Sequence, residues 1–143
     1  MSTRSDSTPT NLKPTYLYKL IPHTAPPPSP LPLSLPTSAL DRSSGFVHLS
    51  TAAQVPGTLR FFFSDHPHVY LARIPYERVE GDVRWEDPKA EVCGVRGGEG
   101  VFPHLYNERV ALGAGEIESV VRWESGVDGW EEAVRKGQDW LVY

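Results

Sequence analysis

The chain has 143 residues, a formal net charge of −4 and a single cysteine. Its length predicts one domain, able to bury roughly 68% of the surface that the unfolded chain exposes. The acidic balance argues against a dedicated nucleic-acid-binding protein, because neutralising phosphates requires clustered Lys and Arg. One cysteine cannot form an internal disulfide. With no apolar run near 18 residues and no leader sequence, we expect a cytoplasmic protein that does not bind membranes.

The amino-terminal part alternates between segments that can and cannot bury apolar side chains. Residues 1–14 are rich in Ser, Thr and Pro and are predicted to be a disordered tail. Residues 15–143 are predicted to form the single domain, which begins with a strand over Thr15–Ile21. Seven prolines between Pro22 and Pro36 exclude a helix or a central strand, so we expect an extended loop at 22–36.

The next segments predict short helices and strands in turn. Residues 35–44 are compatible with a turn of helix, and a strand is expected over Gly45–Ser50. Thr51 and Gln54 make a T-x-x-Q capping box, which predicts a helix over 52–63. His68–Ile74 lies between two prolines and has the composition of a strand.

The remaining segments complete an architecture with more strands than helices. We expect short strands over Val83–Glu86, Phe102–Tyr106 and Ile117–Trp123, and a helix over Trp130–Trp140. Pro103 indicates that its strand lies at a sheet edge or carries a bulge. Strands and helices do not alternate regularly, so we predict an α+β domain with a mainly antiparallel, strongly curved sheet.

Two of these segments carry chemically useful side chains in alternation with aliphatic ones. In an extended strand successive side chains point to opposite faces. Three side chains in each segment therefore share a face: Phe46, His48 and Ser50 in the first, and Phe102, His104 and Tyr106 in the second. We predict that these faces line one cleft, whose imidazoles, hydroxyls and rings suit a flat, polar small molecule.

Each candidate residue also has a structural interpretation. His48 is the strongest candidate, but a half-buried imidazole bonded to the backbone would fit the same pattern. Either Ser50 or Thr51 is expected to cap the following helix, which leaves the other free for a ligand. Tyr106 could stack on a base or close the core, and Glu86 could act in catalysis or face solvent.

A metal site is the third hypothesis for the histidines. His66-x-His68, His48 and His104 offer imidazoles, but their spacing is weakly specific and no H-E-x-x-H motif is present. We expect no metal cofactor. A serine nucleophile is not expected either, because the chain has no G-x-S-x-G elbow.

Several segments resemble one protein family in their order and in their amino-acid residues. Its features here are Tyr18–Leu20, Gly45–Thr51 with Gln54 and Thr58, Val83–Glu86, and Phe102–Tyr106. On these residues the chain is identified as a member of the family called domain of unknown function 952, over about residues 16 to 123. That family is distantly similar to the ADP-ribosyltransferases, whose split, curved antiparallel sheet grips NAD.

The resemblance implies roles for particular residues. ADP-ribosyltransferases hold the nicotinamide ribose with a His or Arg on the first strand and a Ser, Tyr or second His on the next, and many use a later Glu. Here Tyr18 or Lys19 stands at the first position, where neither His nor Arg occurs. The implied catalytic residues are His48, Glu86 and His104. The implied substrate-binding residues are Tyr18, Lys19, Phe46, Ser50, Thr51, Gln54 and Tyr106.

The resemblance thus implies NAD as co-substrate, in ADP-ribosyl transfer or NAD glycohydrolysis. The branch with two histidines and no catalytic Glu, which includes the RNA 2′-phosphotransferases, is the most similar variant. A noncatalytic module that binds ADP-ribose or another nucleotide could use the same groups, and a metal-dependent enzyme remains the second alternative. In each case the expected partner is a small molecule.

Overall fold

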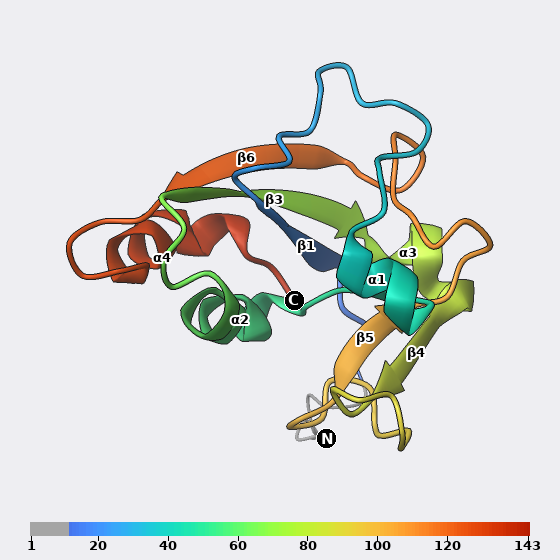
Figure 1. Cartoon of the computed structure of the whole chain (residues 1–143). Coiled ribbons are helices and arrows are strands. Elements are labelled where there is room, and N and C mark those ends of the chain that lie inside the picture. Colours follow the sequence, from blue (N-terminus) through green and yellow to red (C-terminus); the bar gives the residue numbers. More distant parts are fainter. Residues whose placement is uncertain (1–11) are drawn as a thin grey trace.

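Two small antiparallel sheets organise the chain in the computed structural model, which describes residues 12–143 (Figure 1). In the first sheet the strand order is β1 (Tyr16–Pro22), β3 (His68–Pro75) and β6 (Ser119–Glu124). In the second sheet the order is β2 (Val47–His48), β5 (Phe102–Leu105) and β4 (Val83–Glu86). The prediction of an α+β domain with mainly antiparallel strands is confirmed.

A backbone bridge joins the two sheets. Tyr18 of β1 and Ser50, two residues beyond β2, exchange N–H···O bonds of 2.9 Å in both directions. The chain that continues β2 therefore pairs with the edge of the first sheet, while β4 and β5 diverge from it (Figure 1). This junction brings the His48 segment close to β1.

Short helices begin and end at the residues that favour such ends. In α1 (Ala39–Ser44) the Ser38 side chain accepts a bond from the Asp41 N–H, and Gly45 ends the helix at φ +84°. The expected capping box of Thr51 and Gln54 opens a 3₁₀ turn, Ala52–Gln54, and α2, Val55–Phe62. The remaining helical elements are α3 (Tyr76–Val79), α4 (Glu131–Gly137) and two further 3₁₀ turns (Glu80–Asp82 and Gln138–Trp140).

The first sheet is covered on both faces, so the domain has two apolar cores. One core packs α2 and Trp130, the residue before α4, against Tyr18 and Leu20 of β1. The other packs Leu17 and Ile21 against β2, β5 and α3. Lys19 lies between Leu17 and Ile21, two residues from each. Its side chain therefore points to the same face of β1, toward β2.

The amino-terminal boundary differs from the prediction. Pro14 is buried, and Lys13 forms a 3.0 Å ion pair with Glu80. Lys13 and Pro14 therefore contact the domain, although the predicted tail extends to residue 14. The rest of that segment, residues 1–11, lies outside the described residues.

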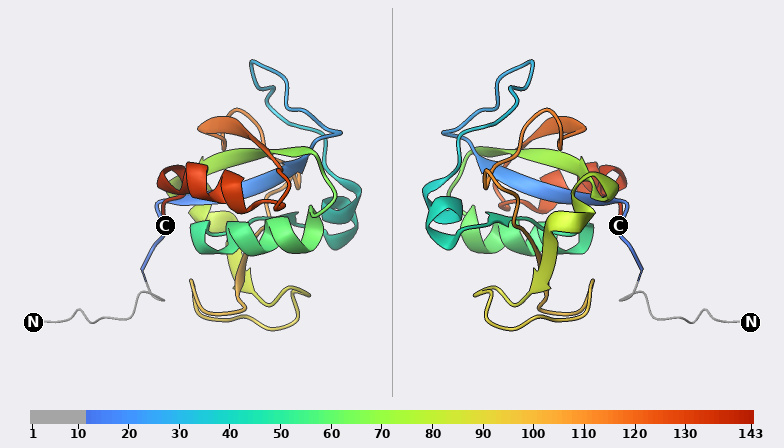
Figure 2. Two further views of the ribbon diagram at one scale, coloured as in Figure 1. Left: turned by 90° about the vertical axis from the view of Figure 1, so that its left-hand side faces the viewer. Right: turned by 90° about the vertical axis from the view of Figure 1, so that its right-hand side faces the viewer.

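The proline-rich segment has neither helix nor strand beyond Pro22, which is the last residue of β1. It rises above the first sheet (Figure 2). Its second half is nevertheless attached, because the Leu35 N–H donates to Leu112 O at 2.7 Å and Pro32 O accepts from the Ala114 N–H at 2.9 Å. No helix within residues 12–143 combines the length and apolar character that crossing a membrane requires.

Pro103 was predicted to lie at a sheet edge or in a bulge, and the structure corrects the first alternative because Pro103 does not lie at an edge. It occupies the central strand of the second sheet, opposite Trp85 of β4. On the β2 side, Leu49 donates its N–H to Pro103 O at 3.1 Å, but proline has no N–H to return. The β2–β5 ladder ends at this point, which explains why β2 has only two residues.

Candidate functional site

Two imidazole–carboxylate pairs lie side by side in the second sheet. His48 of β2 is directly opposite His104 of β5, and their ring centres are 5.6 Å apart. His48 Nδ1 is 2.7 Å from Asp41 Oδ1, and His104 Nδ1 is 2.8 Å from Glu86 Oε1. The structure thus brings together all three residues implied to be catalytic, and it adds Asp41.

The Asp41–His48 pair is completed by Lys19. Asp41 Oδ2 is 2.8 Å from Lys19 Nζ, and Asp41 Oδ1 also accepts the His48 backbone N–H at 3.3 Å. Lys19 in turn donates to His48 O at 3.2 Å. Burial of Asp41 opposes its ionisation, but the hydrogen bond from His48 and the charge of Lys19 outweigh burial, so the pKa of Asp41 is lowered. The carboxylate is therefore ionised at neutral pH.

The Glu86–His104 pair is more deeply buried and is completed by Tyr106. The Tyr106 hydroxyl donates to the same oxygen, Glu86 Oε1, at 2.6 Å. Only 2% of His104 and 6% of Glu86 is exposed. Burial lowers the pKa of His104 although Glu86 acts in the opposite direction. Burial and the carboxylate together raise the pKa of Tyr106 to about 12.

Phe46 fills the space between the two pairs. Its ring stacks on His104 at 4.1 Å with 23° between the planes, and it lies 4.5 Å from His48 and 5.1 Å from Tyr106. Phe46 is only 5% exposed. The Phe46 ring therefore leaves no open face on which a base could stack. It packs between the side chains that were predicted to line a cleft. The accessible groups are the edge of His48, with 29% of its side chain exposed, and Tyr106.

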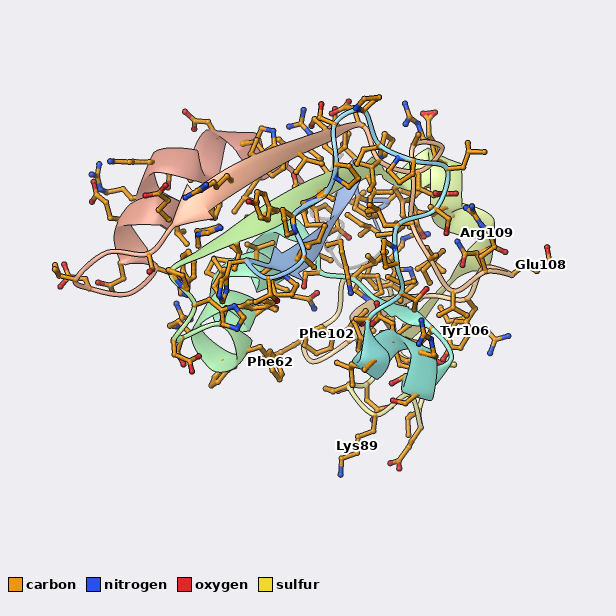
Figure 3. The ribbon with its side chains drawn as sticks, turned by 45° about the horizontal axis from the view of Figure 1, so that its top comes forward. Phe62, Lys89, Phe102, Tyr106, Glu108 and Arg109 are labelled. Atoms are coloured by element: carbon orange, nitrogen blue, oxygen red, sulfur yellow. The ribbon has the colours of Figure 1, made fainter. Side chains whose placement is uncertain are left out.

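Tyr106, labelled in Figure 3, carries a cation on its ring. The guanidinium carbon of Arg84, an exposed residue of β4, is 4.3 Å from the ring centre. Such a contact contributes about 0.5–1 kcal/mol at an exposed site. Arg84 thus places a positive charge over the ring of Tyr106.

Four of the implied substrate-binding residues use their polar groups elsewhere in the fold. The Tyr18 hydroxyl donates to Trp140 O at 3.0 Å and accepts the Val142 N–H at 2.7 Å, in the other core. Ser50 Oγ is 3.2 Å from Thr58 Oγ1. Thr51 and Gln54 form the capping box, and Gln54 Nε2 donates to Val101 O at 2.7 Å. The contacts of Ser50, Thr51 and Gln54 lie at or near the start of α2, those of Tyr18 lie at the carboxyl-terminal segment, and none is with an imidazole.

Two surface hollows lie away from the imidazole pairs. One, of about 280 Å³, is lined by α2 and α4 residues that include Arg60 and Val134. The other, of about 360 Å³, lies between the proline-rich segment and the β3–β6 edge and includes Leu31 and Tyr70. Neither contains a residue that the sequence implied for the site.

Asp41 is the residue that sequence reasoning missed. Its only local signal is its position three residues after Ser38, which is typical of helix capping. Seven residues separate it from His48, but the left-handed turn at Gly45 between them breaks any helical or strand periodicity. Only the turn of the chain after α1 brings the carboxylate to the imidazole.

The histidines of this site do not assemble a metal centre with the neighbouring acids. Within residues 12–143, no group of three or more His, Cys, Asp or Glu side chains has an arrangement that could hold a metal ion. The hypothesis of a metal-dependent enzyme thus has no geometric support at His48 and His104.

The burial of His104 leads to a prediction about pH. We expect its imidazole to titrate below the ordinary value of about 6.5. As the pH falls through that value, the unfolded chain takes up the proton before the folded chain does, so the free energy of unfolding should decrease. The imidazole C–H resonances of His104 in an NMR titration measure this. A midpoint at or above the ordinary value of about 6.5 would contradict the assignment.

The family model for DUF952, described as proteins of unknown function, matches residues 33–121. The chain belongs to the DUF952 family. The match includes α1, both imidazoles of the site and both carboxylates that accept from them. No curated protein matches this DUF952 chain.

Solved structures share the fold of this DUF952 domain. The crystal structure of protein CC0527 from Caulobacter crescentus is 24% identical, with a TM-score of 0.61, and the match covers 80% of this chain and 91% of that one. The solution NMR structure of CC0527 is 25% identical, with a TM-score of 0.57, covering 80% of this chain and 90% of that one. These matches support the two-sheet architecture.

Proposed function

We propose that this protein binds NAD beside His48 and cleaves the bond between nicotinamide and ribose, passing the ADP-ribosyl group to an acceptor or to water. The observation that carries the proposal is the pair of imidazole–carboxylate contacts on neighbouring strands, 5.6 Å apart between ring centres. These strands adjoin the first sheet through the Tyr18–Ser50 bridge. In this proposal the divided sheet is the counterpart of the split sheet of ADP-ribosyltransferases.

The chemistry requires a base and a polar environment for a cation. The C1′–N bond of NAD breaks with its electron pair going to nicotinamide, which leaves a positively charged ribose ring. In hydrolysis, the oxygen of water forms the new bond to C1′ and releases one proton. Because Asp41 occupies Nδ1 of His48, the second nitrogen, Nε2, is the one available to accept this proton.

The two carboxylates have different roles in this proposal. Asp41 orients His48, and its negative charge stabilises the imidazolium that forms. Glu86 and His104 are too buried to touch the substrate, so they act as positioning residues that hold Phe46 and Tyr106. Lys19, which donates to Asp41 and to His48 O, keeps the first pair in place.

One observation favours a noncatalytic function as the second candidate. Glu86 Oε1 already accepts from both His104 and Tyr106. It is therefore poorly placed to stabilise a cationic ribose, which a binding module for ADP-ribose or a related nucleotide does not need to do.

Incubation of the purified chain with NAD tests the proposal. Chromatography should detect equal amounts of nicotinamide and ADP-ribose, or nicotinamide alone when an acceptor takes the ribosyl group. His48→Ala should slow release by about 10²–10⁴-fold, the range for losing a general base. His68→Ala, a histidine of β3 that belongs to neither pair, is the matched control and should retain the wild-type rate.

Binding measurements separate the two candidates. Calorimetry should detect binding of ADP-ribose. The His48→Ala substitution should make the binding free energy less favourable by about 1–3 kcal/mol, as expected for leaving a polar partner unpaired. Binding of this kind without nicotinamide release would favour the noncatalytic module. Unchanged affinity together with a lower melting temperature in His48→Ala would make His48 a structural residue and contradict both candidates.

A further inference from the structure

Three of the five histidines gather outside the imidazole pairs, at the end of β1. The β1–β3 register ends at Pro22 opposite Val69, so the next residues along each strand, His23 and His68, also face each other. Their ring centres are 5.6 Å apart. His66 lies on the other side of His23, with the two Nδ1 atoms 3.1 Å apart.

Local turns hold His23 and His66 in this arrangement. The Ala25 N–H donates to Pro22 O at 3.0 Å, which places His23 inside a turn. The His66 N–H donates to Phe63 O at 3.1 Å, and the Phe63 ring lies 4.9 Å from the imidazole. Both histidines are half-buried, and each is next to a proline, Pro22 or Pro67. Little backbone freedom is therefore left to lose when both rings bind one ligand.

The distance between the two nitrogens suits a metal ion. Two imidazole nitrogens at Zn–N distances of 2.0–2.1 Å and a tetrahedral angle are roughly 3.3 Å apart. The observed 3.1 Å is close to this separation. Neutral imidazole is a preferred ligand of zinc and of neighbouring first-row cations. In the absence of an ion, the same contact is a hydrogen bond in which one Nδ1–H donates to the other ring.

We propose that His23 and His66 form a bidentate site for Zn²⁺ through their Nδ1 atoms, with water completing the coordination. No third ligand is in place within residues 12–143, so the site is open and exchanges its ion readily. His68, whose ring centre is 5.6 Å from that of His23, is the nearest further imidazole.

The surrounding charge is mixed. Glu124 of β6 lies opposite His68 and is paired with Arg122 at 3.0 Å. Its carboxylate is therefore not free for the metal unless that ion pair opens. A bound ion would link the segment after β1 to the segment before β3 and stabilise the folded state, because the unfolded chain lacks the preformed pair. This site does not depend on the proposed activity.

The test uses untagged full-length protein, treated with EDTA and dialysed, because a purification tag would itself bind zinc. Calorimetry with ZnCl₂ should show one equivalent bound. His23→Ala and His66→Ala should each weaken binding at least about tenfold, since a single remaining imidazole loses the chelate. His48→Ala should bind zinc like the wild type, which distinguishes this site from the imidazole pairs.

NMR provides the second readout and does not depend on the stability of any variant. In the wild-type protein, zinc should shift the imidazole resonances of His23 and His66 and leave those of His48 and His104 in place. The proposal is overturned if zinc does not bind, if zinc shifts only His48 and His104, or if His23→Ala and His66→Ala bind as tightly as the wild type.

Discussion

Replacing Asp41 by asparagine should lower the free energy of unfolding by about 2–4 kcal/mol. Only 3% of Asp41 is exposed, and its carboxylate joins Lys19 to both His48 Nδ1 and the His48 N–H. The amide keeps the size of the side chain but removes the charge. Lys19, with 17% of its side chain exposed, then lacks its counter-ion in a poorly hydrated place. Urea denaturation at pH 7 measures the loss.

The same substitution should change the response to acid. Because the pKa of Asp41 is lower in the folded state, the unfolded chain takes up this proton first as the pH falls. The stabilisation is therefore complete above the ordinary carboxyl pKa and is lost as the pH falls through the lower, folded value. Asp41→Asn should lose this part of the acid sensitivity. Asp128→Asn, at an exposed position before α4, is the control, and equal stability of the two variants would contradict the assignment.

Replacing Glu86 by alanine should lower the free energy of unfolding of the protein by about 2–3 kcal/mol. His104 Nδ1 would lose its partner in a place that water hardly reaches, and the Tyr106 hydroxyl would lose its acceptor. Glu86→Gln should cost about half as much, because an amide oxygen can still accept both bonds but carries no charge.

Two measurements make this prediction specific. Denaturation midpoints give the order of stability, with Glu99→Ala in the exposed loop before β5 as the matched control. Absorbance titration of tyrosine gives the second readout. The Tyr106 pKa of about 12 should move toward its ordinary value in Glu86→Ala, since the carboxylate helps to raise it. A Glu86→Ala protein as stable as the control would show that the buried pair contributes little.

Local sequence patterns predicted most elements but not their partners. The alternation of aromatic and polar residues around His48 and His104 predicted a shared face, and the two residues are indeed opposite each other on adjacent strands. The capping box at Thr51 and Gln54 correctly predicted the start of the helical segment. Both signals act over a few residues, where backbone geometry alone determines which side chains and donors meet.

Predictions that depended on the neighbouring strand were less successful. Pro103 was expected at an edge or a bulge but lies in a central strand, where its missing N–H ends the pairing with β2. The alternation along its strand predicted that Ser50 faces a ligand. In the structure its hydroxyl instead contacts Thr58 of α2. In both cases the outcome depends on an element that is separate in the chain.

By itself, the sequence determined the α+β class, the positions of most strands and helices, and the family to which the chain belongs. The tertiary structure decided which polar groups form a site. Asp41 meets His48 only because the chain reverses at Gly45, and Glu86 meets His104 only because β4 and β5 pair in one register. Hydrogen-bond partners depend on distances below about 3.2 Å, and such distances follow from packing between segments rather than from the order of residues within them.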